Sequence, residues 1–507
     1  MTLIEADIAM TLLKDRPTAD GASPFLADAI WSDRLYSGGW TEGRGGRLEV
    51  VEPATGGLLG RVGRAGREDV AAAAARARAA QPAWAALPPD ARQAVLLKAA
   101  ALLVEKAGEA APWIMRETGS VDAKAAVELE HAAGFVRQAA MMATEAQGLL
   151  LPSSDGRLSM ARRVPLGVVG VISPFNFPLV LSIRAVAPAL AAGNAVVLKP
   201  DPRTPISGGF LIARLFEAAG LPEGLLHVLP GDAEAGDAMC RDPNIAMIAF
   251  TGSTAAGRKV GEVAGAHLKK VALELGGNNA LIILDDADPD VAASNAAWGA
   301  WLHQGQICMT TGRVLVQQRL HDAVVERLVA KAAHLPVGDP ATGRVALGPL
   351  ISRPQMDRVR AIVADTVAAG ATLAAGGPGE GLFFPPTVLT GVRPGMRAFD
   401  EEIFGPVAVV TAFEDDAEAA ALANRGDYGL SAGIITGSVG RGMVLGEQLR
   451  VGHLHINDQT VEAGPHSPFG GMGASGNGSR ISGPANLDEF TTWRWTTVKT
   501  AATPYPF

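Results

Sequence analysis

Residues 163–174 read Arg163-Val-Pro-Leu-Gly-Val-Val-Gly-Val-Ile-Ser-Pro174, a mostly apolar segment that stops at a polar residue and a proline. Helical patterns separate it from three similar segments, Ala195-Val-Val-Leu-Lys-Pro200, Leu226-His-Val-Leu-Pro-Gly231 and Ala246-Met-Ile-Ala-Phe-Thr-Gly-Ser253. Apolar strands that alternate with helices predict a parallel sheet covered on both faces. Ligands of such sheets bind at the carboxyl ends of the strands, so we expect the chemistry there. The residues at these ends are Ser173, Lys199, Gly231 and Thr251.

The same alternation restarts in the second half of the chain. Ala280-Leu-Ile-Ile-Leu284 is followed by a helical region, and helix and strand then alternate to about Phe413 and on to His453-Leu-His-Ile-Asn457. This pattern predicts a second α/β lobe. Near the end, Phe490-Thr-Thr-Trp-Arg-Trp-Thr-Thr-Val498 predicts an amphipathic strand. It is too long and apolar to remain an exposed edge, so we expect it to pair with another strand.

The first 150 residues favour short strands followed by helices. Residues 1–33 carry no clear pattern and are expected to form a surface extension. Short strands with glycine turns are expected from Arg34 onward. Helical patterns cover residues 67–80, 89–107, 110–117 and 122–147. Pro82 is expected to end the first of these helices.

The composition limits the class of protein. The chain has 507 residues, of which 48 % are hydrophobic and 19 % charged, as in a globular protein of several domains. A net charge of −8 argues against nucleic acid or an anionic membrane surface as a partner. Val164 to Ile183 carries no charge, but three prolines interrupt it, so no membrane span is expected. The acidic N-terminus is unlike an export signal, and two cysteines form no disulfide framework, which favours the reducing cytoplasm.

Cys308, in Gly305-Gln-Ile-Cys-Met-Thr310, is one of only two cysteines. It has two possible roles. Most free cysteines are small buried hydrophobic residues. A nucleophile would instead need a base and an oxyanion donor from elsewhere in the chain.

Two further polar residues allow similar alternatives. Asn176 follows a buried strand in Ser173-Pro-Phe-Asn-Phe-Pro178, where its amide could donate to an oxyanion or cap the following helix. Glu274, in Val271-Ala-Leu-Glu-Leu-Gly-Gly277, is a solvent-facing acid or a general base with room to move beside two glycines.

Several strand ends and loops carry groups that suit a nucleotide. Lys199 is a solvated terminal lysine or a donor to ribose or phosphate. Ser253 is a good helix N-cap, and the free amides of that first turn form a phosphate site. Glu402 offers an acceptor for sugar hydroxyls, and Phe404 an apolar wall.

Together these motifs resemble the NAD(P)-dependent aldehyde dehydrogenases in order and approximate spacing, from about Leu35 to Val498. The motifs are Ser173-Pro-Phe-Asn-Phe-Pro, Lys199-Pro, Phe250-Thr-Gly-Ser, Glu274-Leu-Gly-Gly, Gly305-Gln-Ile-Cys, Glu402-Ile-Phe-Gly-Pro and Pro468-Phe-Gly-Gly. The resemblance implies an α/β fold with three parts: a Rossmann-like cofactor domain over residues 34–148 and 164–278, an α/β catalytic domain over 279–472, and a small β oligomerisation arm over 149–163 and 487–500.

The resemblance also implies a mechanism. The Cys308 thiolate attacks the aldehyde carbon, and the Asn176 amide with the Cys308 backbone N–H holds the oxyanion. Hydride then passes to the nicotinamide, and Glu274 activates the water that hydrolyses the thioester. No metal is expected. The implied cofactor contacts are Ile172, Pro174, Asn176, Lys199, Gly231, Gly252, Ser253, Leu275, Glu402 and Phe404.

The sequence departs from the family pattern at two places. Many NAD-preferring members carry a glutamate three residues after the strand-end lysine, where it binds the ribose 2′-hydroxyl and repels a 2′-phosphate. Pro202 stands there, beside Arg203, so we expect NAD with NADP possible. Many members also carry a glutamate soon after the last glycine run. Ser479-Arg480 stands there, so no proton relay is assigned to it.

The substrate is expected to be an aromatic aldehyde. Leu302-His-Gln-Gly-Gln-Ile-Cys-Met309 and Gly470-Gly-Met-Gly-Ala-Ser-Gly-Asn-Gly-Ser-Arg480 look most like benzaldehyde dehydrogenases of aromatic degradation. Arg184 would meet a polar substituent or form a structural ion pair. The expected pocket residues are Phe177, Arg184, Ile307, Met309, Asn457 and Phe469.

Other functions stay open at this point. An aliphatic aldehyde or a semialdehyde is the alternative substrate. A cofactor-independent cysteine hydrolase, or a non-catalytic binding protein, is the alternative class. The resemblance implies a homodimer or homotetramer in which residues 490–498 pair across subunits with the stretch near 149–163.

Overall fold

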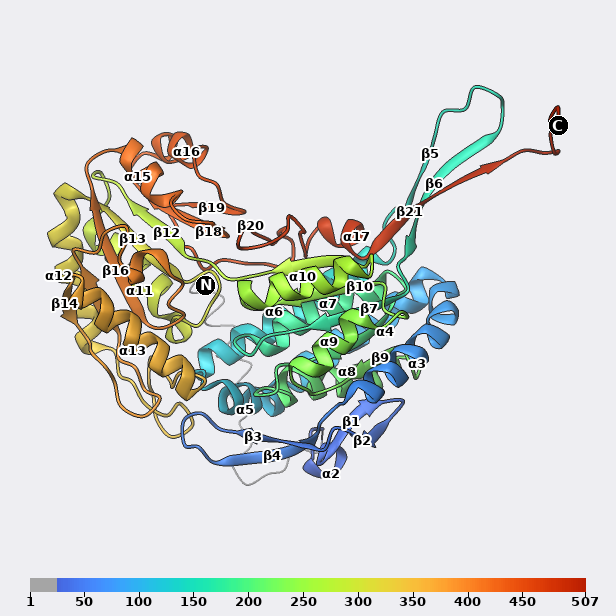
Figure 1. Cartoon of the computed structure of the whole chain (residues 1–507), viewed down its shortest axis with the longest axis horizontal. Coiled ribbons are helices and arrows are strands. Elements are labelled where there is room, and N and C mark those ends of the chain that lie inside the picture. Colours follow the sequence, from blue (N-terminus) through green and yellow to red (C-terminus); the bar gives the residue numbers. More distant parts are fainter. Residues whose placement is uncertain (1–24) are drawn as a thin grey trace.

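Two seven-stranded sheets, one in each half of the chain, form the frame of the protein (Figure 1). The structure is a computed structural model that describes residues 25–507. The first sheet has the strand order β11-β10-β7-β8-β9-β1-β2. Its parallel part comprises β7 (Val168–Ile172), β8 (Ala195–Lys199), β9 (Leu226–Val228), β10 (Met247–Thr251) and β11 (Lys270–Glu274). Every residue of β7 and β8 is buried, and the predicted parallel sheet is confirmed.

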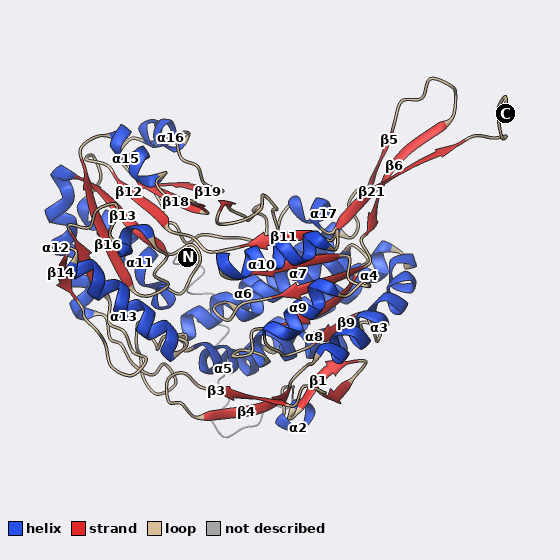
Figure 2. Cartoon of the chain, in the orientation of Figure 1, coloured by secondary structure: helices blue, strands red, loops and turns tan. Residues whose placement is uncertain are grey.

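Helices cover both faces of this sheet (Figure 2). They are α3 (Arg67–Ala86), α4 (Pro89–Glu105), α5 (Ala107–Thr118), α6 (Asp122–Met142), α7 (Pro178–Ala191), α8 (Leu211–Ala219), α9 (Ala233–Arg241) and α10 (Thr254–Ala266). The expected stop at Pro82 is wrong, because α3 continues through it to Ala86. The side chains of Gln81 and Trp84 bind the carbonyls of Gly193 and Leu190, each at 2.8 Å. This packing fixes the last turn of α3, although Pro82 removes a backbone donor.

The residues before the first sheet are partly buried. Helix α2 (Asp28–Trp31) leads into the antiparallel pair β1 (Arg34–Ser37) and β2 (Trp40–Glu42). The ring of Trp31 is fully buried and meets Trp113 edge to face at 5.6 Å. The expected surface extension over residues 1–33 is therefore wrong for residues 25–33, and residues 1–24 lie outside the described part of the chain.

The second sheet has the order β14-β15-β16-β13-β12-β18-β19 and matches the second α/β unit predicted from the sequence. Its strands are β12 (Asn279–Ile283), β13 (Thr311–Gln317), β14 (Thr372–Ala375), β15 (Thr387–Thr390), β16 (Val407–Phe413), β18 (Ser431–Ile435) and β19 (His453–Ile456), all parallel except β14. The main helices beside it are α11 (Pro289–Trp301), α12 (His321–His334), α13 (Arg353–Ala368), α15 (Asp416–Ala423) and α16 (Val439–Gly446).

A three-stranded arm projects away from the body of the molecule (Figure 1). Its strand β21 (Thr491–Val498) pairs along its whole length with β6 (Leu158–Pro165), which in turn pairs with β5 (Gly148–Leu150). The expected partner segment is thus right in sequence. The pairing with this stretch occurs within the chain and not across subunits, and it uses one edge of β21, which is the edge strand of the arm.

The glycine-dense segment 469–478 connects the two halves of the structure. Its strand β20 (Met472–Gly473) pairs with β17 (Tyr428–Gly429) of the second half. The carbonyl of Ser475 accepts the amide of Leu275 at 2.9 Å, next to a β-bridge between Glu274 and Gly476. The segment therefore lies against the end of β11, where Glu274 stands.

Candidate active site

The carboxyl ends of three parallel strands lie side by side at one edge of the first sheet. Ile172, the last residue of β7, is opposite Lys199 on β8 and Phe250 on β10. The turn after β10 starts helix α10, and the Ser253 hydroxyl accepts the amide of Ala256 at 3.3 Å. The predicted N-cap is confirmed. The predicted cofactor contacts Ile172, Pro174, Lys199, Gly252 and Ser253 stand in or just after these strands, and Gly231 follows the neighbouring strand β9.

Lys199 is buried, so it is not a solvated terminal lysine. Its ammonium group donates to the carbonyls of Pro200 at 3.1 Å and Gly231 at 2.8 Å. Burial lowers the pKa of Lys199, and the nearby carboxylates of Asp201 and Asp232 oppose this shift. Gly236, on α9, would place a Cβ 3.7 Å from Ile172 and 3.8 Å from Lys199. These are ordinary packing distances, so α9 lies directly against the ends of β7 and β8.

Three loops meet at the junction between the two sheets. A Cβ on Gly276 would lie 2.5 Å from Oε2 of Glu402, and one on Gly305 would lie 2.2 Å from the carbonyl of Gly405. Only glycine permits these approaches. The Glu402 carboxylate accepts the amide of Gly277 at 3.0 Å, and burial raises its pKa to about 7. The loops of Glu274, Cys308 and Glu402 are therefore brought together.

Phe404 continues the Glu402 loop with a positive φ of 56°. Its ring meets Phe175 edge to face at 6.0 Å. Phe175 lies in the loop that follows strand β7, so this contact joins the loop of the second sheet to the strand ends of the first.

Cys308 lies in a strained turn before β13. His303 and Gln304, just upstream, adopt left-handed backbone angles, with φ values of 47° and 56°. The Gln304 amide holds this turn by donating to the carbonyls of Gly119 at 2.9 Å and Pro349 at 3.0 Å. Asn279 holds the other side by donating to the Cys308 carbonyl at 2.8 Å. Such strain persists only where the surroundings fix it, and it clusters at active sites.

The two cysteines have different surroundings. Cys240 is buried in the core of the first half, whereas Cys308 is partly exposed. Burial raises the pKa of the Cys308 thiol to about 12, while the positive charge of Arg184 acts in the opposite direction. The thiol therefore needs a nearby base to become a nucleophile at neutral pH.

Asn176 faces the Cys308 loop and does not cap helix α7. Its side-chain amide donates to the carbonyl of Gln306 at 2.9 Å. The first turn of α7 is satisfied instead by the Glu128 carboxylate, which accepts the amides of Leu179 at 2.9 Å and Val180 at 3.2 Å. The capping interpretation is therefore wrong, and one amide proton of Asn176 is not used by the bond to Gln306.

Glu274 is only 1 % exposed, which rules out a solvent-facing acid. Neither carboxylate oxygen has a hydrogen-bond partner among residues 25–507. Burial raises its pKa to about 8, and the charges of Arg184 and Arg480 act against this shift. A buried carboxyl group that titrates near neutral pH has the properties of a general base.

An apolar cluster surrounds Cys308. Its members are Ile307, Met309, Leu430 and Phe469, with Phe177, Leu302, Cys308, Val461 and Ala463 packed against them. It contains four of the six expected pocket residues, and Arg184 joins it by stacking on Phe469. Asn457 is not brought to this cluster, because it is exposed and its side-chain oxygen accepts the amide of Thr436 at 2.9 Å. Leu430, Val461 and Ala463 carry no local sequence signal, and only the fold places them here.

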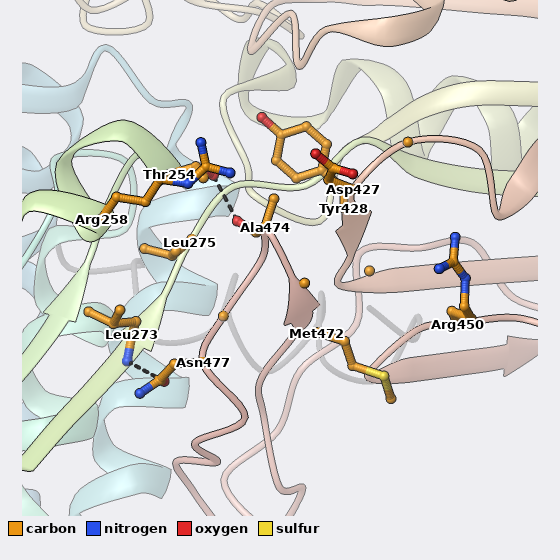
Figure 3. A pocket seen from close by; sticks show the side chains of 14 residues that line it. Thr254, Arg258, Leu273, Leu275, Asp427, Tyr428, Arg450, Met472, Ala474 and Asn477 are labelled. Carbon is orange, nitrogen blue, oxygen red and sulfur yellow. Dashed lines mark hydrogen bonds between the residues drawn. The ribbon is translucent and has the colours of Figure 1, made fainter. Parts of the chain in front are cut away.

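A separate cleft of about 530 Å³ opens between α10, the end of β11 and residues 472–477 (Figure 3). Thr254 donates to the Ala474 carbonyl at 2.8 Å, and Asn477 accepts the amide of Leu273 at 3.0 Å. Leu275 is the one predicted site residue that lines this cleft. The predicted catalytic residues thus lie outside it.

Comparison with known proteins identifies the family. The sequence profile described as the aldehyde dehydrogenase family matches residues 40–496. The chain belongs to the aldehyde dehydrogenase family. This membership confirms the predicted fold class and the predicted enzyme class, an oxidoreductase that oxidises aldehydes with a nicotinamide cofactor. None of the described helices is long and apolar enough to span a membrane.

Three relatives of this aldehyde dehydrogenase are informative. A vanillin dehydrogenase of Amycolatopsis sp. is 54 % identical over 95 % of this chain and 100 % of its own. A benzaldehyde dehydrogenase [NAD(+)] of Pseudomonas putida is 49 % identical over 94 % of this chain and 98 % of its own. The crystal structure of a salicylaldehyde dehydrogenase from Pseudomonas putida G7, complexed with salicylaldehyde, superposes with a TM-score of 0.90 at 35 % identity, over 94 % of this chain and 99 % of that one.

Proposed function

We propose that this aldehyde dehydrogenase oxidises an aromatic aldehyde to the carboxylic acid with NAD. The observation that carries the proposal is the apolar cluster around Cys308, which contains the rings of Phe177 and Phe469. Aromatic side chains suit an aromatic ring as ligand. The relatives named as vanillin and benzaldehyde dehydrogenases support the same substrate class.

The residues around Cys308 fit the steps of this oxidation. The Cys308 thiol adds to the aldehyde carbon and gives up its proton, for which the unpartnered carboxylate of Glu274 is a suitable acceptor. The free N–H of Asn176 and the backbone N–H of Cys308 stabilise the resulting oxyanion. When bound, the nicotinamide accepts the hydride. Cys308 then carries a thioester. Once Glu274 has released the thiol proton to solvent, it takes a proton from the water that hydrolyses the thioester, and the Cys308 sulfur leaves as the thiolate.

The chemical groups at the ends of the first sheet's parallel strands suit a dinucleotide. Lys199 provides a buried ammonium group, and the first turn of α10 provides free amides for a phosphate. Glu402 provides a carboxylate for ribose hydroxyls, and Phe404 forms an apolar wall beside it.

The Asp201–Arg203 pair favours NAD over NADP. Arg203 makes two 2.7 Å bonds to the carboxylate of Asp201 and stacks on Phe175 at 4.2 Å from the ring centroid. The guanidinium is therefore engaged rather than free for a 2′-phosphate. The Asp201 carboxylate, two residues after Lys199, supplies negative charge where Pro202 replaces the usual acid.

We also propose that the protein is a homo-oligomer held by its arm. The arm exposes large apolar side chains, among them Leu150 at 80 % and Trp495 at 68 %. Exposed apolar surface of this kind marks an interface, and a second copy of the chain is the proposed cover. Light scattering on the wild type and on Trp495→Ser tests this. A monomeric wild type would contradict it.

The proposed location is the reducing cytoplasm, which suits the two free thiols of Cys240 and Cys308.

The decisive test measures the absorbance of reduced nicotinamide with benzaldehyde, hexanal and succinic semialdehyde, each with NAD and NADP. Benzaldehyde with NAD is expected to react most efficiently. Cys308→Ala is expected to abolish oxidation and to keep NAD binding, because it removes only the nucleophile. Preference for an aliphatic aldehyde would reject the aromatic substrate. Ester hydrolysis without any aldehyde oxidation would favour a cysteine hydrolase.

A further inference from the structure

Arg184 is a buried cation whose guanidinium is only partly used within residues 25–507. It lies on helix α7 and is 3 % exposed. Its Nε and Nη2 atoms have no acceptor among the described residues, and no ion pair forms there. Buried charges are normally paired, because leaving a charge without partners in the interior is costly. The structural ion pair considered for Arg184 is therefore absent from residues 25–507.

Arg184 lies among the residues that are proposed to carry out the reaction. Its guanidinium stacks on Phe469 with 4.2 Å between Cζ and the ring centroid, and Phe469 belongs to the apolar cluster around Cys308. Burial lowers the pKa of Arg184, and the negative charges of Glu274 and Cys308 oppose this shift. The Glu274 carboxyl group also has no hydrogen-bond partner among the described residues, so it and the Arg184 guanidinium lie in the same region without bonding to each other. The acceptor for Arg184 is thus expected to come from outside the described part of the chain, and a bound substrate is the candidate.

We propose that Arg184 is a specificity-determining residue that donates to an oxygen substituent on the aromatic ring of the aldehyde. This inference rests on the proposed function and narrows it to hydroxylated benzaldehydes. A hydroxyl group conjugated with the aldehyde is acidic, and a guanidinium binds phenol and phenolate oxygens through charge-assisted hydrogen bonds. The stacking on Phe469 fixes the plane of the guanidinium and so directs its free N–H groups.

The test compares kcat/KM for vanillin and benzaldehyde, two aldehydes that differ in their ring oxygens. The wild type is expected to favour vanillin. In Arg184→Gln the ratio of the two values is expected to fall by roughly 10- to 100-fold, through KM, because bonds to a charged donor are lost. Arg184→Lys keeps the charge and is expected to restore part of the ratio. A wild type that prefers benzaldehyde would overturn the inference while leaving the proposed function intact.

Arg480→Gln is the matched control. Arg480 also acts on the charge of Glu274, but its guanidinium is bound to the carbonyls of Gly471 at 3.1 Å and Ser479 at 2.8 Å. It is expected to leave the vanillin-to-benzaldehyde ratio unchanged. The proposal is wrong if both variants lower kcat/KM by the same factor for vanillin and for benzaldehyde and shift the pH profile of activity alike. Arg184 would then act through Glu274.

A binding measurement separates recognition from turnover and from misfolding. Calorimetry on Cys308→Ala is expected to show tighter binding of vanillin than of benzaldehyde. The added Arg184→Gln change is expected to remove this difference while NAD still binds, which shows that the variant is folded. Equal binding of both aldehydes to Cys308→Ala would overturn the proposal. Failure of the wild type to oxidise any aromatic aldehyde would instead reject the proposed function.

Discussion

Two buried pairs of opposite charge lie at helix α7, and only one of them is joined. Lys124 and Glu128 form a buried ion pair, and Glu128 also accepts two backbone amides from the first turn of α7. Arg184 and Glu274 are buried to a similar degree, but neither Glu274 oxygen nor the Nε and Nη2 atoms of Arg184 have a partner among the described residues. The same kinds of side chain are thus bonded to each other in one pair and not bonded in the other.

The difference separates a structural pair from a functional one. A joined pair with satisfied hydrogen bonds holds a helix start in place. An unjoined pair destabilises the fold, and its groups remain available to substrate, water and protons. Each cation also lies on a ring of the cluster around Cys308, Lys124 on Phe177 at 4.3 Å and Arg184 on Phe469 at 4.2 Å. Each pair therefore contacts one aromatic residue of the cluster around Cys308.

In the unjoined pair, Glu274→Gln is expected to cause the largest loss of turnover. Removing a general base lowers turnover by roughly 10²- to 10⁴-fold. Because Glu274 is proposed to act on both the thiol and the hydrolytic water, the first turnover and the steady state are both expected to slow, and rapid-mixing absorbance of the reduced cofactor measures the two phases. Unchanged steady-state turnover would show that Glu274 is not the base.

Glu128→Gln tests the joined side. It leaves the Lys124 charge buried without its partner, which typically costs about 3–5 kcal/mol of folding free energy. Denaturant unfolding measures this loss. The double variant Lys124→Met/Glu128→Gln removes both charges and is expected to recover most of the stability. Loss of activity with unchanged stability in Glu128→Gln would mean that this pair is not structural.

The pH dependence of stability should differ between wild type and Glu274→Gln. The pKa of Glu274 is raised from its ordinary value of 4.5 to about 8, so the folded protein holds this proton more tightly than the unfolded chain does. Its contribution to stability is complete below pH 4.5 and is lost as the pH rises through 8. The variant is expected to melt higher than the wild type at pH 9 by on the order of 2 °C, and not at pH 4. An equal difference at both pH values would contradict the unjoined state of Glu274.

The pair Asp201–Arg203 gives a third, more exposed case with the smallest expected effect. Asp201→Asn frees Arg203 to bind a 2′-phosphate. The ratio of kcat/KM with NADP to that with NAD is therefore expected to rise by about 3- to 10-fold, a modest change because the ion pair is partly exposed to solvent. Stability is expected to change by less than about 0.5 kcal/mol. Fluorescence quenching by NADP measures binding directly. An unchanged cofactor ratio would show that this pair does not face the ribose.

The elements that depend on local chemistry were predictable from the sequence. The buried strands β7, β8 and β10, the Ser253 cap and the helices of the first half follow from apolar patterns and capping preferences, which act over a few residues. The resemblance to a family, carried by seven short motifs, added Cys308, Glu274 and Asn176, which the fold brings to one junction. Gly276 and Gly305 stand where the loops of Glu274 and Cys308 approach the Glu402 loop closely, so these two glycines mark the junction in the sequence itself.

The tertiary structure decided what depends on distant partners. Pro82 stays inside α3 because Gln81 and Trp84 bind carbonyls more than 100 residues away. Asn457 turns to Thr436 rather than to the cluster around Cys308, and β21 pairs within its own chain. The sequence by itself determined the local elements and singled out the residues proposed to react. Only the tertiary structure decided which charges are joined, because Glu128 and Glu274 are the same residue type and differ solely in the groups that the fold brings to them.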